Sequence, residues 1–366
     1  MGEYPLIEVD LGKLERNARA IVDRCAALGI GVTGVIKGCS GLPECAAAMA
    51  RGGCAHIASS RLDELAGARA HGVDLPTMMI RIPMPSEAAD TVRLADISLN
   101  SELSTLALLD GEARKQGRRH GILLMAELGD LREGIWDRGE FLETAVAVER
   151  GFGGLDLLGI GTNLGCYGSI APTAEKMEAL AELAGLVEGE LGRKLEMVSG
   201  GASTAFPRVM DRDMPGAINN LRIGENILIG RDLADLWGYD MGFLHNDVFV
   251  LKAEIIEAKT KPSHPIGEIM FDAFRNRPTY EDRGLRKRAL AAVGKADYAW
   301  ADHLLPLEEG IQLLGASSDH TILDVEDARR DLRPGDVVEF GLCYGPAVLL
   351  THSPGVRIVF KGSPVA

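Results

Sequence analysis

The sequence predicts a (β/α)8 barrel of the TIM type followed by a smaller, mainly β domain. Three observations support this α/β fold class. Short apolar runs typical of buried strands alternate with helical segments eight times before residue 245. The glycine-rich phosphate loop that an open, doubly wound sheet places after its first strand is absent from the chain. After His245, glycine, proline and short alternating runs replace the long helical segments.

The expected barrel strands lie at regular intervals along the chain. They cover residues 32–37, 56–60, 77–83, 97–100, 121–128, 155–163, 196–200 and 219–223. Among the helical segments between them, the clearest apolar stripe consists of Met177, Leu180, Ala184, Val187 and Leu191. The active site of such a barrel is expected at the carboxyl ends of the strands.

The residues outside the barrel are expected to form one further domain. Residues 6–10 predict a short strand, and Asp10 can cap the helix that follows. Residues 248–256 alternate, and residues 334–340 indicate a turn that enters a strand. We therefore expect an N-terminal strand in residues 1–10 that joins the β domain, a barrel at 11–244 and a C-terminal β domain at 245–366.

Length and charge exclude several classes of function. A chain of 366 residues, 46% of them hydrophobic, can bury two cores. A net charge of -14 argues against a nucleic acid or an anionic membrane as partner, because phosphate groups require a basic face. No apolar run reaches the roughly 18 residues of a membrane span, and the N-terminus lacks a signal-peptide pattern. We expect a cytoplasmic protein.

The cysteines and histidines show no metal-binding spacing, so we expect no metal site. In a cytoplasmic chain the six cysteines are expected to be reduced. Only Cys166, beyond the sixth barrel strand, is placed where it could take part in chemistry, and a structural thiol is the alternative for it.

Lys37 ends a short apolar run and is followed by the small residues 38–41. Val32, Val35 and Ile36 predict a buried strand that carries the lysine to the barrel mouth. Apolar surroundings lower the pKa of an amine and free its lone pair for a carbonyl, which is the chemistry of a Schiff base. The alternative is a lysine whose amine extends into solvent.

A glycine-containing loop, Ser199 to Ser203, follows the seventh strand. We expect Ser203 to cap the helical turn that begins at Thr204. Barrels bind phosphate in the loops after their seventh and eighth strands, where backbone N–H groups and hydroxyls meet. An ordinary glycine turn is the alternative.

Arg222 ends the eighth strand, and Gly224 follows where the backbone could approach the same phosphate. A salt bridge to Glu127 or Asp130 is the alternative for this arginine. A lysine that binds a carbonyl, a phosphate cradle and an arginine for a pyridine nitrogen together predict a pyridoxal 5'-phosphate site.

Nine segments of the chain carry a resemblance to a known family. They are VIK (35–37), MIRIPM (79–84), ADISLNSE (95–102), LGDLREG (128–134), CYG (166–168), SGG (199–201), LRIGE (221–225), PIGE (265–268) and LGASSDH (314–320). With these motifs the chain resembles the alanine racemase superfamily, the fold type III pyridoxal phosphate enzymes, and within it the ornithine racemase branch. The resemblance covers residues 4 to about 345.

The resemblance implies a pyridoxal phosphate-binding barrel joined to a β domain, in a head-to-tail homodimer whose sites borrow residues from the partner's β domain. Lys37 matches the cofactor lysine, Arg132 the arginine at the phenolic oxygen, and Arg222 the arginine at the pyridine nitrogen. The other cofactor-binding positions that it implies are Asn163, Ser199, Gly201, Ser203, Gly224 and Glu225.

An arginine at the ring nitrogen bears on the type of reaction. Its permanent charge disfavours protonation of the nitrogen, so a carbanion at Cα is short-lived and is reprotonated locally, which suits racemisation. Racemisation requires a proton donor on each face of Cα, and Lys37 can serve one face.

The second donor is where the sequence departs from alanine racemases, which use a tyrosine from the partner chain. Glu268 aligns near that tyrosine, and Asn163 stands where those enzymes have a histidine. Besides Glu268, the candidates for the second donor are Cys166, Tyr167, Asp319 and His320. Glu268 and Cys166 are the expected catalytic partners of Lys37, and we expect Asp319, His320 and Tyr167 to contact substrate.

Acidic side chains near the site would pair with a substrate ammonium group. Glu225, Glu268, Asp272 and Asp319 are the candidates, and we expect a basic amino acid as substrate, ornithine first. Alanine, lysine and arginine are the alternatives. Two other classes on this fold are a pyridoxal phosphate-dependent decarboxylase and a non-catalytic pyridoxal phosphate carrier, and the β domain argues against the carrier.

Overall fold

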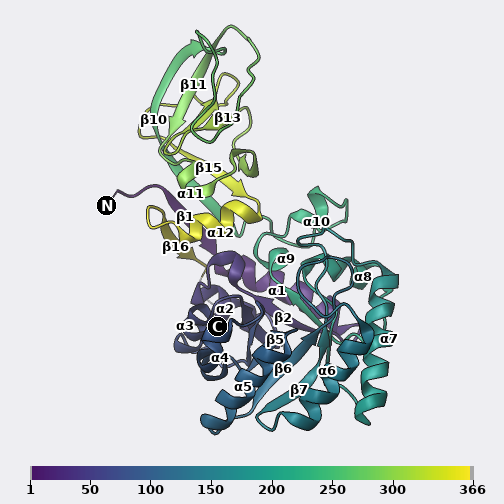
Figure 1. The fold of residues 1–366 in the computed structure, drawn as a ribbon. Coiled ribbons are helices and arrows are strands. Elements are labelled where there is room, and N and C mark those ends of the chain that lie inside the picture. Colours follow the sequence, from purple (N-terminus) through teal and green to yellow (C-terminus); the bar gives the residue numbers. More distant parts are fainter. Residues whose placement is uncertain (1, 363–366) are drawn as a thin grey trace. The chain divides into compact units, whose positions relative to one another are not determined.

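The computed structural model describes residues 2–362, which divide into two compact units. One unit covers residues 11–245, and the other combines residues 2–10 with residues 246–362. Figure 1 shows the elements of both units.

The larger unit is a closed parallel barrel of eight strands, β2 to β9, paired in chain order and closed by β9 against β2. The strands are β2 (Gly31–Val35), β3 (His56–Ser59), β4 (Thr77–Met79), β5 (Ile97–Asn100), β6 (His120–Met125), β7 (Leu155–Gly161), β8 (Met197–Ser199) and β9 (Asn220–Ile223). The predicted (β/α)8 barrel is confirmed.

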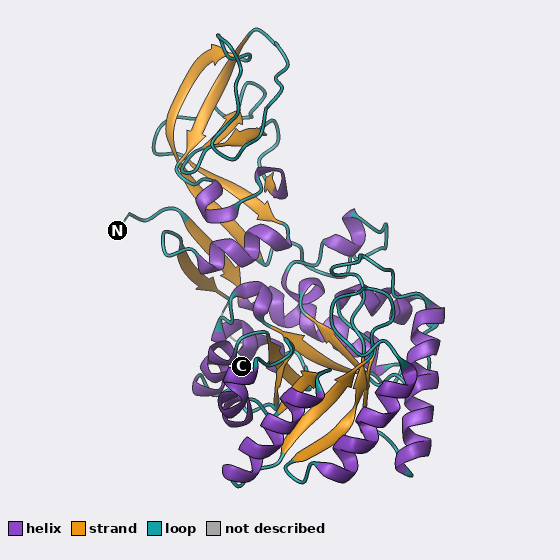
Figure 2. Cartoon of the chain, viewed as in Figure 1, coloured by secondary structure: helices purple, strands orange, loops and turns teal. Residues whose placement is uncertain are grey.

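Helices surround these strands (Figure 2). The α-helices are α1 (Leu11–Ala26), α2 (Pro43–Arg51), α3 (Leu62–Ala70), α4 (Ala88–Leu94), α5 (Leu103–Lys115), α6 (Arg138–Gly151), α7 (Ala174–Leu191), α8 (Phe206–Met210), α9 (Glu225–Leu228) and α10 (Asp232–Asp235). Three 3-10 turns, η1 (Lys37–Cys39), η2 (Pro85–Glu87) and η3 (Ser203–Ala205), lie in the loops.

The alternation of side chains along the strands produces two apolar layers. On β6, Leu123 and Met125 pack with Val35 and Leu99 inside the barrel. Ile122 and Leu124 belong to a second cluster with side chains of α5, α6 and α7. The stripe predicted on α7 faces this second cluster, in which Met177, Leu180, Ala184 and Val187 are buried and Leu191 is partly buried.

Strand ends differ from the expectation by a few residues. Residues 32–37 were expected as strand, but β2 ends at Val35 because the Ile36 carbonyl accepts the N–H groups of Cys39 and Gly41. Lys37 therefore begins the turn η1 immediately beyond the strand. This places its amine at the carboxyl end of the barrel, where the site was expected.

The second unit is a mainly antiparallel β domain, as predicted for the fold. Its strands are β1 (Leu6–Asp10), β10 (Phe249–Pro262), β11 (Leu285–Ala291), β12 (Leu304–Pro306), β13 (Gln312–Ala316), β14 (Thr321–Asp324), β15 (Val337–Leu342) and β16 (Arg357–Lys361). It also contains α11 (Lys295–Tyr298), η4 (Ala301–His303) and α12 (Tyr344–His352). The strand order is β12-β15-β10-β11-β14-β13, and β1 pairs with β10 and β16.

The long strand β10 organises this unit. Its first half pairs with β1 and β15, and its second half pairs with β11 after a bulge between Ile255 and Glu257. The buried core includes Leu251, Phe340 and Tyr298. In residues 2–362 no helix is both long enough and apolar enough to cross a membrane.

Candidate active site

Lys37 lies at the barrel mouth among charged side chains that come from three other loops and strands. Burial lowers the pKa of its amine, and the charges of Arg132 and Arg222 lower it further, whereas Cys166 and Glu133 act in the opposite direction. The structure gives this amine no hydrogen bond or ion pair within residues 2–362. An amine whose charged form is disfavoured is more available as a nucleophile and as a base than an exposed lysine.

Arg222 on β9 is 3% exposed and is held by neutral groups. It donates to the Ser199 hydroxyl at 2.5 Å and to the Thr162 carbonyl at 2.8 Å. The salt bridge to Glu127 or Asp130 that we considered as the alternative is not formed. Burial without a bonded carboxylate lowers the pKa of the guanidinium to about 10, so it stays charged at neutral pH.

A chain of hydrogen bonds supports Arg222 from inside the barrel. The Ser199 hydroxyl donates to the side-chain amide oxygen of Asn220 at 2.7 Å, and the side-chain NH2 of Asn220 donates to the Thr33 hydroxyl at 2.9 Å. These residues come from β8, β9 and β2, all of which border the same sector of the barrel. Ser199 thus contacts Arg222 directly and helps to orient its guanidinium, and its predicted contact with a cofactor stays a prediction.

Arg132 lies in the loop between β6 and α6, next to a carboxylate that the sequence analysis missed. Its guanidinium donates two hydrogen bonds to Glu133, one of them at 2.5 Å, and this pairing raises the pKa of Arg132 above its usual range. The backbone N–H of Arg132 is bonded to the Glu127 carboxylate at 3.1 Å. Both ends of Arg132 are therefore fixed by carboxylates.

The phosphate-type cradle is formed by the loops after β8 and β9. The expected cap by Ser203 on its own turn is not observed; its hydroxyl instead accepts the N–H groups of Gly224 at 3.3 Å and Asn226 at 3.5 Å. Gly201 has a φ of +115°, which favours glycine. A side chain at 224 would bring its Cβ to 2.8 Å from the Val35 carbonyl oxygen. The cradle therefore lies against the end of β2, two residues from Lys37.

Asn163 and Glu225 differ in their fit to this site. Asn163, beyond the end of β7, is 9% exposed, and its side-chain NH2 is buried with no partner in the described part of the chain. The Glu225 carboxylate accepts the N–H groups of Arg231 at 3.3 Å and Asp232 at 3.2 Å, so only its backbone adjoins the cradle. An orphaned donor such as that of Asn163 is what a bound ligand would satisfy.

The remaining candidates lie on exposed segments. Cys166 and Tyr167 follow β7, and the Tyr167 side chain is 74% exposed. Glu268, Asp319 and His320 belong to the β-domain unit, where the Asp319 carboxylate accepts the Ser318 hydroxyl at 2.6 Å. Their part in catalysis or substrate binding stays a prediction.

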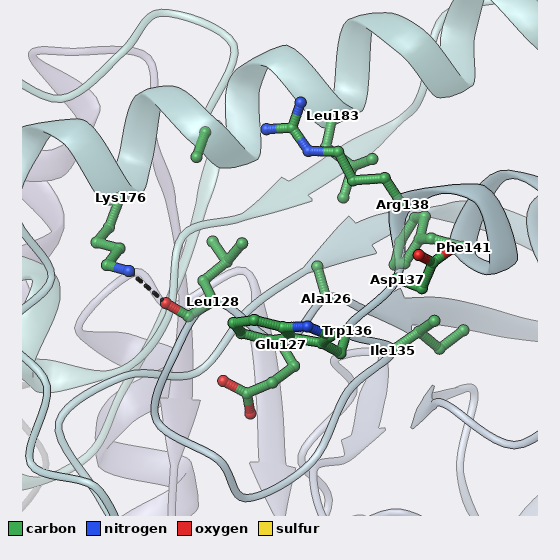
Figure 3. A pocket seen from close by; sticks show the side chains of 11 residues that line it. Ala126, Glu127, Leu128, Ile135, Trp136, Asp137, Arg138, Phe141, Lys176 and Leu183 are labelled. Carbon is green, nitrogen blue, oxygen red and sulfur yellow. Dashed lines mark hydrogen bonds between the residues drawn. The ribbon is translucent and has the colours of Figure 1, made fainter.

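A hollow of about 240 Å³ lies beside the loop that carries Arg132, and of the site residues described above Glu127 lines it (Figure 3). Trp136, Phe141, Leu183 and Lys176 are among its walls. The Lys176 amine donates to the Leu128 carbonyl at 2.7 Å. Through this bond α7 anchors the loop from outside the barrel.

The structure is thus a barrel with three features at the carboxyl ends of its strands. They are a lysine with a lowered pKa (Lys37), a loop pair of glycine and serine (Ser203 and Gly224) and a buried arginine (Arg222). Residues 9–230 match the model of the alanine racemase N-terminal domain. The chain belongs to the alanine racemase family.

Relatives extend the similarity to nearly the whole chain. An ornithine racemase of Acetoanaerobium sticklandii is 38% identical over 344 residues, which are 93% of this chain and 95% of the relative. A lysine racemase of Thermotoga maritima is 36% identical over 360 residues, covering 98% of this chain and 99% of the relative. Among solved structures, an alanine racemase from Streptomyces lavendulae superposes with a TM-score of 0.77 at 20% identity, covering 99% of this chain and 98% of that chain.

Proposed function

We propose that this protein is a pyridoxal 5'-phosphate-dependent racemase that interconverts the L and D forms of a basic amino acid, with ornithine as the first candidate. The observation that carries the proposal is the similarity, over more than nine tenths of the chain, to racemases named for ornithine and for lysine. Both amino acids carry a side-chain ammonium group, whereas alanine does not.

The residues at the barrel mouth fit pyridoxal phosphate. Lys37 would hold the cofactor through its amine, and the cradle of Gly201, Ser203 and Gly224 suits a phosphate. The unpartnered NH2 of Asn163 provides a donor that a polar ring substituent could use. When bound, the cofactor supplies an electron-withdrawing ring that acidifies the Cα–H bond of an amino acid.

The chain's own residues would move the proton. Lys37, whose pKa is lowered by burial, can take a proton from Cα or return one there more readily than an exposed lysine. Arg222 remains charged and would repel a second positive charge at a ring nitrogen beside it. Arg132, fixed by Glu127 and Glu133, would bind an oxygen substituent of the ring.

We propose Cys166 as the second proton-transferring group. It follows β7 at the carboxyl end of the barrel strands, the same edge at which Lys37 follows β2 and Arg222 ends β9, and its side chain is exposed there. Glu268 is the alternative, and it would have to come from the β domain of a partner protomer. The comparison of Cys166→Ser with Glu268→Gln decides between them: the true donor's variant retains Cα exchange with solvent but loses inversion.

A homodimer is part of the proposal. Within the β-domain unit, the loop between β10 and β11 exposes a series of large apolar side chains, Ile266 at 91%, Phe271 at 67% and Met270 at 66%. Apolar side chains clustered in this way favour a protein interface.

The test of the proposal is turnover of single enantiomers with pyridoxal phosphate present, with products resolved by chiral chromatography. We expect D-ornithine from L-ornithine, with lysine second and alanine far slower. Comparable turnover of alanine would contradict the substrate class, and release of carbon dioxide would indicate the decarboxylase. Cofactor binding without turnover of any amino acid would indicate the carrier.

A further inference from the structure

Asp130 is a fully buried carboxylate in the loop between β6 and α6, and it makes bonds to a different loop. One oxygen accepts the N–H groups of Gly165 at 3.1 Å, Cys166 at 3.3 Å and Ile170 at 3.4 Å. The other oxygen accepts the N–H of Tyr167 at 3.0 Å. One side chain thus organises the whole turn after β7.

No lysine or arginine forms an ion pair with Asp130 among the residues described. Burial alone would raise the pKa of this carboxyl, but the backbone N–H groups hold it below its usual value. The negative charge is therefore stabilised mainly by the backbone of residues 165–170, with a weaker attraction to Arg132, and this backbone must keep its conformation for the charge to stay buried.

Close packing fixes the same turn. A side chain at Gly168 would bring its Cβ to 2.6 Å from the Asp130 carbonyl oxygen, and one at Gly165 would come to 2.8 Å from the Thr204 methyl carbon. Gly165 also has a φ of +77°. The Thr204 hydroxyl donates to the Leu164 carbonyl at 2.8 Å. The turn is held between the loop of Asp130 and the loop that contains the cradle.

The loop that carries Asp130 is itself anchored. The Glu127 carboxylate accepts the N–H groups of Gly129 and Arg132. Figure 3 shows the second anchor, the hydrogen bond from the Lys176 amine to the Leu128 carbonyl. The loop that carries Asp130 is therefore rigid, and the exposed Cys166 side chain extends from a backbone that this loop fixes.

We infer that Asp130 is a positioning residue for Cys166: by binding the backbone of the turn after β7, it holds the thiol at the carboxyl ends of the barrel strands, the edge at which Lys37 and Arg222 also lie. This inference rests on the proposed function, because it gives Cys166 its place in the proton transfer. A thiol on a backbone that Asp130 fixes meets an alkylating agent in one environment, so a change in the turn should change its rate of alkylation.

The experiment measures alkylation of Cys166 and racemisation in the same variants. Iodoacetamide labelling of the peptide that contains Cys166, followed by mass spectrometry, is compared in the unmodified protein and in Asp130→Asn at one pH. We expect about tenfold slower labelling in Asp130→Asn, in the range of effects that coupled neighbours show. Because labelling requires no turnover, it tests Asp130 even if the protein does not racemise ornithine.

Racemisation tests the link to catalysis through a double-mutant cycle. Asp130→Asn and Cys166→Ser should each lower racemisation, and Asp130→Asn should lower it little further when Cys166 is already replaced. The inference would be overturned if the two substitutions lowered the racemisation rate by independent factors that multiply in the double variant. Unchanged labelling of Cys166 in Asp130→Asn would overturn it as well.

Two further variants separate positioning from folding. Asp137→Asn is the matched control, since Asp137 caps α6 through the Glu140 N–H at 2.9 Å in the same loop but does not touch the turn after β7. It should leave labelling of Cys166 unchanged. If Asp130→Asn does not fold, Gly168→Ala takes its place, because it keeps the carboxylate and displaces the turn. It should slow labelling in the same way, and labelling at the original rate would refute the inference.

Discussion

Glu225 is expected to destabilise the protein at neutral and alkaline pH. It begins α9, and burial, aided by the charge of Asp232, raises the pKa of its carboxyl from 4.5 to about 7, although the N–H groups of Asp232 and Arg231 act in the opposite direction. In the unfolded chain the group ionises near 4.5, whereas in the folded protein it keeps its proton up to about pH 7. Stability is thus lost as the pH rises through this window.

The magnitude follows from this difference in pKa. The raised pKa lowers the free energy of unfolding by about 1 kcal/mol near pH 5.5, where the carboxyl is ionised in the unfolded chain but still protonated in the folded protein. Above about pH 8 the carboxyl is ionised in both states, and the free energy of unfolding is lower by roughly 3 kcal/mol. Glu225→Gln removes this cost while its carbonyl oxygen can still accept the N–H groups of Arg231 and Asp232, as one carboxylate oxygen does now.

The assay is urea denaturation of Glu225→Gln and of the unmodified protein at both pH values. We expect the variant to be more stable by about 1 kcal/mol near pH 5.5 and by roughly 3 kcal/mol near pH 8. Glu178→Gln, an exposed change on α7, is the control and should shift neither value. A gain that does not grow with pH, or a less stable variant at pH 8, would refute the reasoning.

Three other changes test the cofactor site and the interface. Lys37→Ala should abolish the yellow absorbance of the protein mixed with pyridoxal phosphate, and a normal spectrum would contradict the role of Lys37. Gly224→Ala, whose Cβ would approach the Val35 carbonyl oxygen to 2.8 Å, should lower stability by about 1–3 kcal/mol in urea denaturation and weaken cofactor binding. The control is Gly185→Ala on α7, where a Cβ meets no atom within 4 Å, so neither stability nor cofactor binding should fall. Equal stability of the two glycine variants would argue against the predicted clash at Gly224. Phe271→Asp should shift sedimentation toward the monomer, and an unchanged mass would argue against the interface.

The barrel could be predicted because its signals are local. Eight apolar runs and the helical stripes between them require only the periodicity of buried strands and helices, and the structure confirms their type and order. Strand ends were less predictable: β4 stops at Met79, four residues before the expected end, and Arg81 turns its guanidinium to the Ser60 and Ile82 carbonyls and to Glu87.

The locations of site residues could be predicted for those that stand at the end of a strand. Lys37 and Arg222 follow from strand ends alone, whereas the partners of the loop residues do not. Asp130 was considered only as a partner of Arg222, because nothing in the sequence indicates that its carboxylate meets the backbone of residues 165–170. Glu133 was missed although it adjoins Arg132, and a charged pair directly after a buried strand was the available signal.

The most direct test of the proposed racemisation is deuterium incorporation at Cα of ornithine in heavy water, with the holoenzyme and with Lys37→Ala. We predict that L-ornithine yields D-ornithine carrying deuterium at Cα, and that Lys37→Ala yields none. Exchange that retains the L configuration, or no exchange at all in a protein that binds pyridoxal phosphate, would contradict the proposed racemisation.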